Sequence, residues 1–236
     1  MMKLNKKPVL YHVLNQVKNC KKIDKIIVAT TNKKEDNKIC DFVRSMKIMC
    51  FRGKSLDVLD RYYNCAKKHS LSTIVRITAD NPLIDPIIID SMIERFNRNR
   101  CDIATNSVPR TFPYGTEVEV FSFKALETIW KKTLDSIDRE HVTSYFYRNP
   151  KNFKILNVTN KQDLSNYRWT LDEKADFNLI EQLVLKIPKD PILMEDILKI
   201  LKNNPKLIKL NKMIRHKEIN ITKNKLPSKK QNLQRI

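Results

Sequence analysis

The pattern of apolar and polar positions along the first half of the chain predicts an alternating series of helices and strands. Apolar residues spaced three and four apart predict helices at 8–19, 34–46, 55–67 and 86–97. Short β-branched runs between them predict strands at 26–30, 48–51 and 74–78. This alternation is typical of a doubly wound α/β sheet whose strands run largely parallel.

The second half of the chain is less regular but continues the same mixture of elements. Strand patterns fall at 102–106, 117–121, 153–158 and 167–171. Helical patterns fall at 123–132, 136–147, 174–186 and 191–203. With no internal repeat and no linker rich in Gly, Ser or Pro, we expect one domain over residues 1–220. Residues 221–236 are polar and basic, and we expect them to be disordered.

Composition narrows the class of protein. The 236 residues are 41% hydrophobic and 31% charged, which suits one sizeable soluble domain. The five cysteines are scattered and form no C-x-x-C pair, so we expect free thiols in a reducing compartment rather than a disulfide framework or a zinc site. No apolar run is long enough for a membrane span, and the N-terminus has no signal-peptide core. A cytoplasmic location is the resulting expectation.

The formal net charge of +20 is concentrated toward the C-terminus, where Glu218 is the only acid in residues 199–236. A basic tail can bind nucleic acid, an acidic membrane surface or a partner protein. Lys, Asn and Ile are abundant throughout, however, and this bias resembles that of an AT-rich genome. The chain has no recognition-helix motif, aromatic interleaving or basic folded core, so we do not expect nucleic acid as its partner.

An acid stands where the strand predicted at 74–78 gives way to a loop. Pro82 has no N–H to donate, so strand pairing ends before it. Asp80 therefore lies at the carboxyl end of a buried strand, which is where open α/β sheets bind ligands. It could help to hold Mg²⁺ beside a phosphate-bearing substrate. Alternatively, it could only cap the helix that begins near Pro86, and the spacing alone does not decide between these roles.

A second acid stands in the same situation. Asp172 follows the strand predicted at 167–171 and precedes a predicted helix. Parallel strands of one sheet would bring Asp80 and Asp172 to the same edge. Two neighbouring carboxylates repel each other unless a cation or a proton lies between them. The pattern predicts a Mg²⁺ site made of two carboxylates and substrate phosphates, with helix capping as the alternative for both residues.

Five segments in order resemble one family of enzymes. Residues 51–62 resemble the family pattern R-G-S-x-x-D-V-L-x-R-Y, and residues 75–86 resemble V-R-I-T-G-D-C-P-L-I-D-P. Residues 110–121, 138–143 and 164–176 resemble R-T-Y-P-D-G-L-D-V-E-V-F, S-x-R-E-H-V-T and L-S-x-x-R-W-T-V-D-T-P-E-D. The pattern is that of cytidylyltransferases of the spore coat polysaccharide biosynthesis protein F type, which are similar to acylneuraminate and CMP-Kdo cytidylyltransferases.

This resemblance implies a fold and a reaction. The fold is a Rossmann-like, glycosyltransferase-A-like three-layer sandwich of the nucleotide-diphospho-sugar transferases. In the reaction, a sugar hydroxyl attacks the α-phosphate of CTP, pyrophosphate leaves, and a CMP-sugar forms for surface polysaccharide or glycan synthesis. Asp80 and Asp172 match the family's catalytic Mg²⁺ carboxylates. The implied partners are CTP and a sugar acid, and a homodimer through residues 107–170 is a further expectation.

The same resemblance implies the residues that bind substrate. The end of the second predicted strand would contribute to the nucleotide pocket, and the 110–121 and 138–143 segments would face the sugar, with Arg139 pairing an acidic sugar. Glu119 could instead face solvent, and His141 could be a core histidine. Arg76 lies inside an apolar strand, so it should face the site or pair with a carboxylate such as Asp80. The expected substrate-binding residues are Arg52, Gly53, Arg76, Gly115, Glu117, Glu119, Arg139, Glu140 and His141.

One departure from the family pattern concerns the N-terminus. Family members begin with an apolar strand and a basic loop, A-R-x-x-S-x-R-L-P-G-K, which precede a segment like residues 4–13 here. The expectation is that the first strand and the triphosphate loop are missing, and that two inner strands have unpaired backbone groups. A truncated, non-catalytic relative that binds a sugar or a partner is the alternative to an active transferase.

Overall fold

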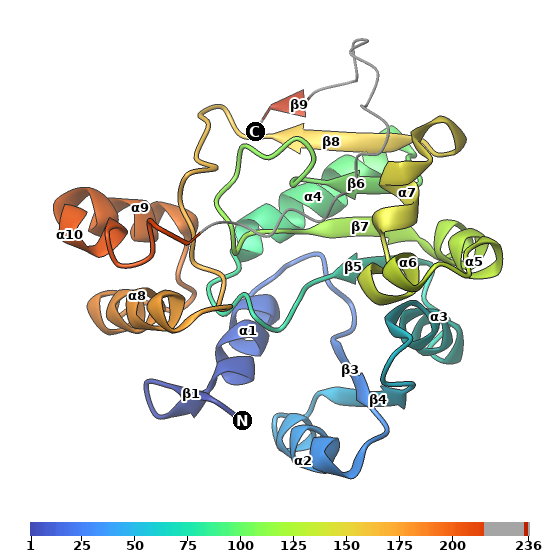
Figure 1. Ribbon diagram of the computed structural model, residues 1–236, viewed down its shortest axis with the longest axis horizontal. Helices are drawn as coiled ribbons and strands as arrows, with labels where there is room; N and C mark the ends of the chain where they lie inside the picture. The colour runs from blue at the N-terminus through green and yellow to red at the C-terminus, as the bar shows by residue number, and fades with distance from the viewer. Residues whose placement is uncertain (215–233, 236) are drawn as a thin grey trace.

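The computed structural model describes residues 1–214 and 234–235, and its centre is a mixed five-stranded sheet (Figure 1). The strands lie in the order β5 (Thr73–Arg76), β7 (Glu119–Ser122), β6 (Ile103–Thr105), β8 (Ile155–Thr159) and β9 (Gln234–Arg235). β7 runs antiparallel to both of its neighbours, whereas β8 runs parallel to β6. The expectation of largely parallel strands rested on the first half of the chain, and β7 from the second half runs antiparallel because a loop rather than a crossover helix joins it to β6.

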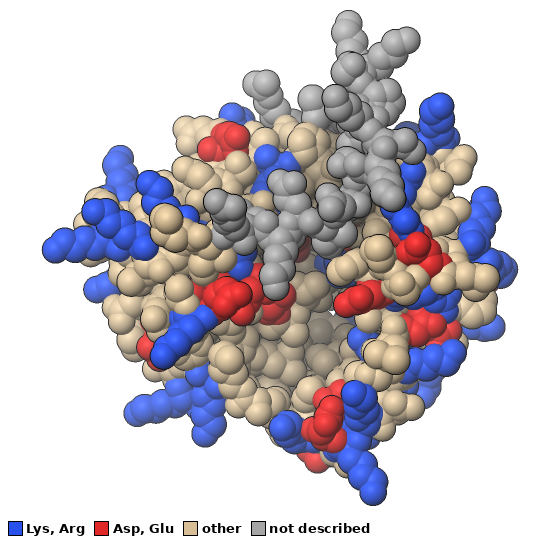
Figure 2. All heavy atoms as spheres, in the orientation of Figure 1, with Lys and Arg blue, Asp and Glu red and all other residues tan. Residues whose placement is uncertain are grey.

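Two strands stand apart from this sheet. β3 (Ile27–Thr31) and β4 (Met49–Gly53) pair in parallel with each other, and β1 (Lys3–Leu4) pairs with β2 (Lys7–Pro8) as a small hairpin. In the described part of the chain, β3 and β5 are not paired, and a cavity of about 650 Å³ separates them. Figure 2 shows the resulting hollow in this face of the molecule. The expectation of two inner strands with unpaired edges is confirmed.

Helices cover both faces of the sheet. On β7, Val120 packs in the cluster that contains α4, whereas the next residue, Phe121, packs in the cluster that contains α3, α5 and α7. This alternation follows from the two-residue period of a strand and produces the predicted three-layer sandwich. The helices are α1 (Val9–Lys18), α2 (Asn37–Ser45), α3 (Val58–Lys68), α4 (Pro86–Asn99), α5 (Phe123–Lys132), α6 (Ser136–His141), α7 (Ser144–Arg148), α8 (Lys174–Lys186), α9 (Met194–Asn203) and α10 (Pro205–Ile208), with short 3-10 turns η1 (Lys34–Asp36) and η2 (Pro150–Asn152).

A third apolar cluster anchors the C-terminal helices. Trp169 and Leu4 are fully buried there against α8 and α9. The loop that precedes α8 is thereby fixed beside the carboxyl end of β5, which is where Asp172 emerges. None of the helices in the described ranges combines the length and the apolar character needed to cross a membrane.

Three predicted elements differ in the structure. The helix predicted at 136–147 is two helices, α6 and α7, because Val142 between them has a φ of 63°. The strand predicted at 167–171 is an irregular segment held by one isolated bridge between Tyr114 and Arg168. The helix predicted to begin at residue 55 begins at Val58, and its cap is Asp57, whose side chain accepts a hydrogen bond from the Asp60 N–H.

Two compositional expectations also change. Cys40 on α2 and Cys50 on β4 form a disulfide with their Cα atoms 5.6 Å apart, so only Cys20, Cys65 and Cys101 are free thiols. The packing of α2 on β4 brings these two residues together, which their separation of ten in sequence did not reveal. Of the tail predicted to be disordered, 234–235 pair with the edge strand β8, and the remainder of 221–236 lies outside the described residues.

Candidate active site

Asp80 lies in the loop that joins β5 to α4. The cap of α4 is Asp85, whose carboxylate accepts hydrogen bonds from the Ile87 N–H at 2.7 Å and the Ile88 N–H at 3.3 Å. Asp80 is therefore not the residue that caps this helix. Its Oδ1 atom is buried and has no hydrogen-bond partner in the described part of the chain. A buried carboxylate oxygen without a partner is costly, and a bound cation would satisfy it.

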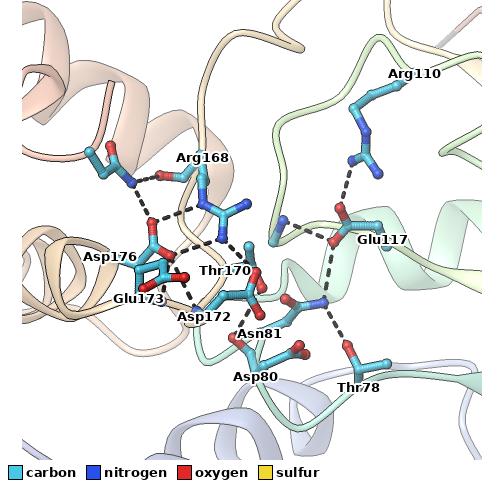
Figure 3. A network of polar contacts seen from close by, with 12 residues as sticks. Thr78, Asp80, Asn81, Arg110, Glu117, Arg168, Thr170, Asp172, Glu173 and Asp176 are labelled. Carbon is cyan, nitrogen blue, oxygen red and sulfur yellow. Dashed lines mark hydrogen bonds and ion pairs between the residues drawn. The ribbon is translucent and has the colours of Figure 1, made fainter. Parts of the chain in front are cut away.

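Asp172 comes to the same place from the other end of the chain. The Leu171 N–H donates to the Asp80 carbonyl oxygen at 2.8 Å, so the backbone next to Asp172 lies against Asp80. Figure 3 shows Asp80 and Asp172 in one polar cluster. The Asp172 side chain is 52% exposed, so one of its oxygens can reach a ligand from solvent.

The cap of α8 is likewise a different acid. The Asp176 side chain accepts hydrogen bonds from the Asp172 and Glu173 N–H groups at 3.2 and 3.0 Å. Asp176 thus satisfies the helix start in a capping box with Glu173, and the Asp172 carboxylate is left outside the cap. Capping explains neither Asp80 nor Asp172.

Arg168 binds two acids near the start of α8, Asp172 just before the helix and Asp176 in its first turn. Arg168 donates from Nε and Nη2 to Asp176 at 2.9 Å each, and from Nη2 to Asp172 at 2.5 Å. Burial would raise the pKa of Asp176, but the hydrogen bonds from Arg168 and Asn211 outweigh it and hold that pKa below its usual value. Burial opposes the charge on Arg168 as well, and the two carboxylates raise its pKa despite this.

Glu117 connects the Asp80 loop to the loop before β7. Its carboxylate accepts hydrogen bonds from the Gly115 N–H at 2.9 Å, from Asn81 at 3.3 Å and from Arg110 at 2.6 Å. Asn81 also donates to the Thr78 hydroxyl at 3.1 Å. Figure 3 shows this chain of contacts reaching the Asp80 side of the cluster. The structure therefore brings Gly115 and Glu117 together with the two predicted metal carboxylates.

Gly115 is required where the backbone passes Trp169. Its φ is +102°, and a Cβ atom there would lie 2.7 Å from the Trp169 carbonyl carbon and 2.8 Å from the Thr170 nitrogen. Both of these are backbone atoms that cannot move aside. A side chain at Gly115 would push the 167–171 segment away from Asp80.

Gly115→Ala is expected to destabilise the fold by roughly 2–4 kcal/mol, from the unfavourable φ together with the steric overlap. Gly53→Ala is the matched control, since its nearest contact is the flexible Arg61 side chain at 3.0 Å. We expect Gly53→Ala to cost less than about 1 kcal/mol. Urea unfolding of both variants measures the difference, and equal effects would contradict the close approach at Gly115.

Arg76 and Glu119 lie inside the fold. Arg76 donates to Glu119 at 2.7 Å, and the carboxylate also accepts from Thr143 at 3.0 Å and from Tyr147 at 2.6 Å. Burial disfavours the charged guanidinium, but Glu119 outweighs this and raises the pKa of Arg76. Of the alternatives for Arg76, pairing with a carboxylate is confirmed, although the partner is Glu119 rather than Asp80. Glu119 is buried, so its solvent-facing alternative is wrong.

The three predicted sugar-binding residues of the 138–143 segment, Arg139, Glu140 and His141, lie in different environments. Arg139 donates to the Asp57 carboxylate from Nε at 2.9 Å and from Nη2 at 2.5 Å, and Nη1 donates to the Trp130 carbonyl oxygen at 3.1 Å. These contacts use the donors that were expected to bind the sugar acid. Glu140 is exposed and His141 is half-buried. Sugar contacts by these three residues stay predictions.

Asp57→Asn is expected to flatten the acid side of the pH–stability profile. Burial acts to raise the pKa of Asp57, but hydrogen bonds from Arg139 and Asp60 hold it below the usual value. A lowered folded pKa stabilises the protein above the unfolded pKa near 3.8, and this contribution is lost as the pH falls through the folded pKa. Unfolding midpoints measured between about pH 6 and pH 2 test this expectation.

In that pH series, Asp57→Asn should lose about 1–2 kcal/mol at neutral pH and show a smaller further loss in acid. Asp41→Asn is the control, because Asp41 is 74% exposed and its nearest cation, Arg44, is 3.7 Å away. That variant should follow the wild type at every pH. An unchanged acid slope in Asp57→Asn would contradict the assignment.

Arg52 and Gly53 end β4. Arg52 donates to the Thr31 and Lys33 carbonyl oxygens at 2.9 and 2.6 Å, and to Asn37 at 2.6 Å. Arg52 therefore ties the loop after β3 to the end of β4. The structure does not gather it with Asp80 and Asp172 in the cluster of Figure 3, and its nucleotide-binding role stays a prediction.

Sequence reasoning missed several polar residues of this region. Arg168 and Asp176 were not identified because residues 167–171 have the composition of a strand. Both lie four residues from Asp172, one before it and one after it, and this spacing could have indicated them. Asp57 was overlooked as a cap because the helix was predicted to begin at residue 55. The residues missed are Asp57, Asn81, Arg110, Arg168 and Asp176.

The cluster fits a hard divalent cation with few protein ligands. Asp80 offers an unpartnered oxygen and Asp172 an accessible one, and Mg²⁺ commonly uses one or two carboxylates together with substrate phosphates. No group of three or more metal-ligating side chains occurs among residues 1–214 and 234–235. A cation here would thus depend on the phosphates of a substrate for its remaining ligands.

Fold and site together define an α/β sandwich of the nucleotidyltransferase class, with paired acids at the carboxyl end of a sheet strand. A sequence model of the family described as Cytidylyltransferase matches residues 1–219. The chain belongs to this cytidylyltransferase family, and the resemblance drawn from its five segments is confirmed.

Individual relatives agree with this assignment. An uncharacterized protein of Methanocaldococcus jannaschii is 38% identical over 219 residues, covering 92% of this chain and 89% of that protein. The spore coat polysaccharide biosynthesis protein SpsF of Bacillus subtilis is 28% identical over 186 residues, covering 77% of this chain and 76% of that one. A cytidylyltransferase structure from Leptospira borgpetersenii has a TM-score of 0.86 at 30% identity and covers 91% of both chains.

A more distant structure shows the fold alone. The CMP:2-keto-3-deoxy-manno-octonic acid synthetase complexed with CTP has a TM-score of 0.60 at 11% identity, covering 78% of this chain and 90% of that one. The three-layer α/β architecture is therefore shared with an enzyme whose structure contains CTP.

Proposed function

We propose that this protein transfers a CMP group from CTP to a hydroxyl of a sugar acid and releases pyrophosphate, for the synthesis of a surface polysaccharide or glycan. The observation that carries the proposal is the unpartnered Asp80 oxygen, together with the accessible Asp172 carboxylate that the hydrogen bond from the Leu171 N–H to the Asp80 carbonyl brings to the same loop. Membership of the cytidylyltransferase family supports CTP as the nucleotide. A sugar acid is supported by relatives named 8-amino-3,8-dideoxy-manno-octulosonate cytidylyltransferase.

In the proposed reaction, the sugar hydroxyl oxygen forms a bond to the α-phosphorus of CTP. The bond from that phosphorus to the bridging oxygen breaks, and pyrophosphate leaves with the electron pair. The hydroxyl proton passes to solvent. Each transfer therefore yields one CMP-sugar and one pyrophosphate.

Asp80 and Asp172 would hold Mg²⁺ at the phosphates. When bound there, the ion would supply neutralisation of the charge on the phosphate oxygens and on the leaving pyrophosphate. Glu117 keeps the Asp80 loop attached to the loop before β7 through Asn81, the residue next to Asp80. Gly115, beside Trp169, allows the sugar-facing loop to approach closely.

A pyrophosphate-release assay tests this function. The protein is incubated with Mg²⁺, each of the four nucleoside triphosphates and a panel of eight- and nine-carbon sugar acids, with the corresponding neutral sugars as controls. We expect release only with CTP and only with one or a few of the acids, and loss of release in Asp172→Asn. Absence of release with every acid, or equal release from all four nucleotides, would contradict the proposal.

A further inference from the structure

The Asp172 carboxylate has one direct side-chain partner in the described chain, the guanidinium of Arg168. The two residues differ in environment, since the Arg168 side chain is 7% exposed and that of Asp172 is 52% exposed. A buried arginine, Arg168, thus contacts an acid, Asp172, whose side chain extends toward solvent at the site. What fixes Arg168 also decides where Asp172 points.

Arg168 is fixed by a fully buried acid. Asp176 is 0% exposed and accepts from both Nε and Nη2 of Arg168, which sets the plane of the guanidinium. Asn211 locks the pair further, since its side chain donates to Asp176 at 2.8 Å and to the Arg168 carbonyl oxygen at 3.0 Å. Asp176 also accepts hydrogen bonds from the backbone N–H groups of Asp172 and Glu173, just before α8. The guanidinium therefore has a rigid support.

We infer that Arg168 is a positioning residue that holds the Asp172 carboxylate toward Asp80 for binding the metal–nucleotide complex. One nitrogen, Nη2, contacts Asp172 and Asp176 together, so the buried ion pair sets the direction of the exposed acid. The positive charge also reduces the repulsion between the Asp80 and Asp172 carboxylates before a cation arrives. This inference rests on the proposed function, because it gives the metal site its geometry.

Lysine cannot reproduce this arrangement. Its single ammonium nitrogen lacks the planar fork that binds one carboxylate with two donors and a second carboxylate with one of them. Arg168→Lys keeps a positive charge beside buried Asp176, so the fold retains its ion pair, whereas Asp172 loses its fixed partner. The two effects can therefore be separated in one variant.

The test titrates Mn²⁺ by electron paramagnetic resonance in the presence of CTP, with thermal unfolding measured on the same samples. Partners that orient a metal ligand typically change metal affinity by about 10–100-fold when altered. We expect at least a tenfold higher Kd for Mn²⁺ in Arg168→Lys. In Arg168→Lys/Asp172→Asn, the Kd should equal that of Asp172→Asn alone, because the effect acts through Asp172.

The control is Arg98→Lys, which alters an exposed pair with Glu94 on α4 and should leave the Kd unchanged. A wild-type Kd in Arg168→Lys, or equal added losses in the presence and absence of Asp172, would overturn the role of Arg168 and leave the proposed function standing. If the wild-type protein binds no Mn²⁺ with CTP, both proposals fail.

Discussion

Asp80→Asn is expected to lower the rate of CMP transfer about a thousandfold or more while the fold stays intact. In the proposed mechanism a bound metal would contribute several kcal/mol of charge stabilisation in the transition state, and about 4 kcal/mol corresponds to a thousandfold in rate. The buried Oδ1 of Asp80 has no protein partner in the described structure, so the amide breaks no internal hydrogen bond at that atom. Initial rates of pyrophosphate release measure the loss of activity. Thermal unfolding midpoints measure whether the fold stays intact.

The control for this substitution is Asp163→Asn, in an exposed turn where the carboxylate accepts from the Ser165 N–H. That variant should retain wild-type turnover. Retention of more than about a tenth of the activity in Asp80→Asn would remove Asp80 from the metal site. The proposed mechanism would then lose its main support.

Glu119→Gln is expected to destabilise the fold by about 3–5 kcal/mol, since it removes one partner of a buried ion pair and leaves Arg76 uncompensated. The Glu119 side chain is 7% exposed and binds Arg76, Thr143 and Tyr147 at once. The amide keeps the size but loses the charge and one acceptor. Urea unfolding measures the free energy of unfolding, and thermal unfolding should show a correspondingly large drop in Tm.

This prediction separates a structural role from the sugar-binding role that the sequence suggested for Glu119. Glu94→Gln is the control, because Glu94 is 43% exposed and its pair with Arg98 should contribute less than about 1 kcal/mol. A loss below about 1 kcal/mol in Glu119→Gln, together with a raised KM for the sugar, would favour the original sugar-binding assignment.

The sequence predicted the position of Asp80 because the evidence for it is local. A β-branched run followed by Asp80 and Pro82 marks the end of a strand, and the structure has β5 end at Arg76, just before this loop. The local sequence also indicates that Asp80 is not the helix cap, because Asp85 directly before Pro86 is a better placed cap for α4. That signal was available but was not used.

The partners of Asp172 could not be predicted in the same way. The segment 167–171 has the apolar and aromatic composition of a strand, yet it packs as an irregular segment because Trp169 is buried against the C-terminal helices. Only this tertiary packing turns Arg168 toward Asp172 and Asp176. The interior pairing of Arg76 with Glu119 also depends on a register, with the two residues opposite each other on β5 and β7.

The disulfide illustrates the same limit. Counting cysteines and their spacings indicates free thiols, because the short distance between Cys40 and Cys50 arises from α2 folding back onto β4. The antiparallel direction of β7 could not be predicted for a related reason. Periodicity reports which face of a strand is buried, but it does not report whether the strand runs parallel or antiparallel to its neighbours.

The most direct test of the two-carboxylate site is the position of a bound metal. Crystals grown with Mn²⁺ and CTP would be measured at a wavelength where manganese scatters anomalously. The account predicts one anomalous peak within about 2.5 Å of a carboxylate oxygen of both Asp80 and Asp172 and next to CTP phosphate oxygens. A peak bound by neither acid, or by only one of them, would contradict it.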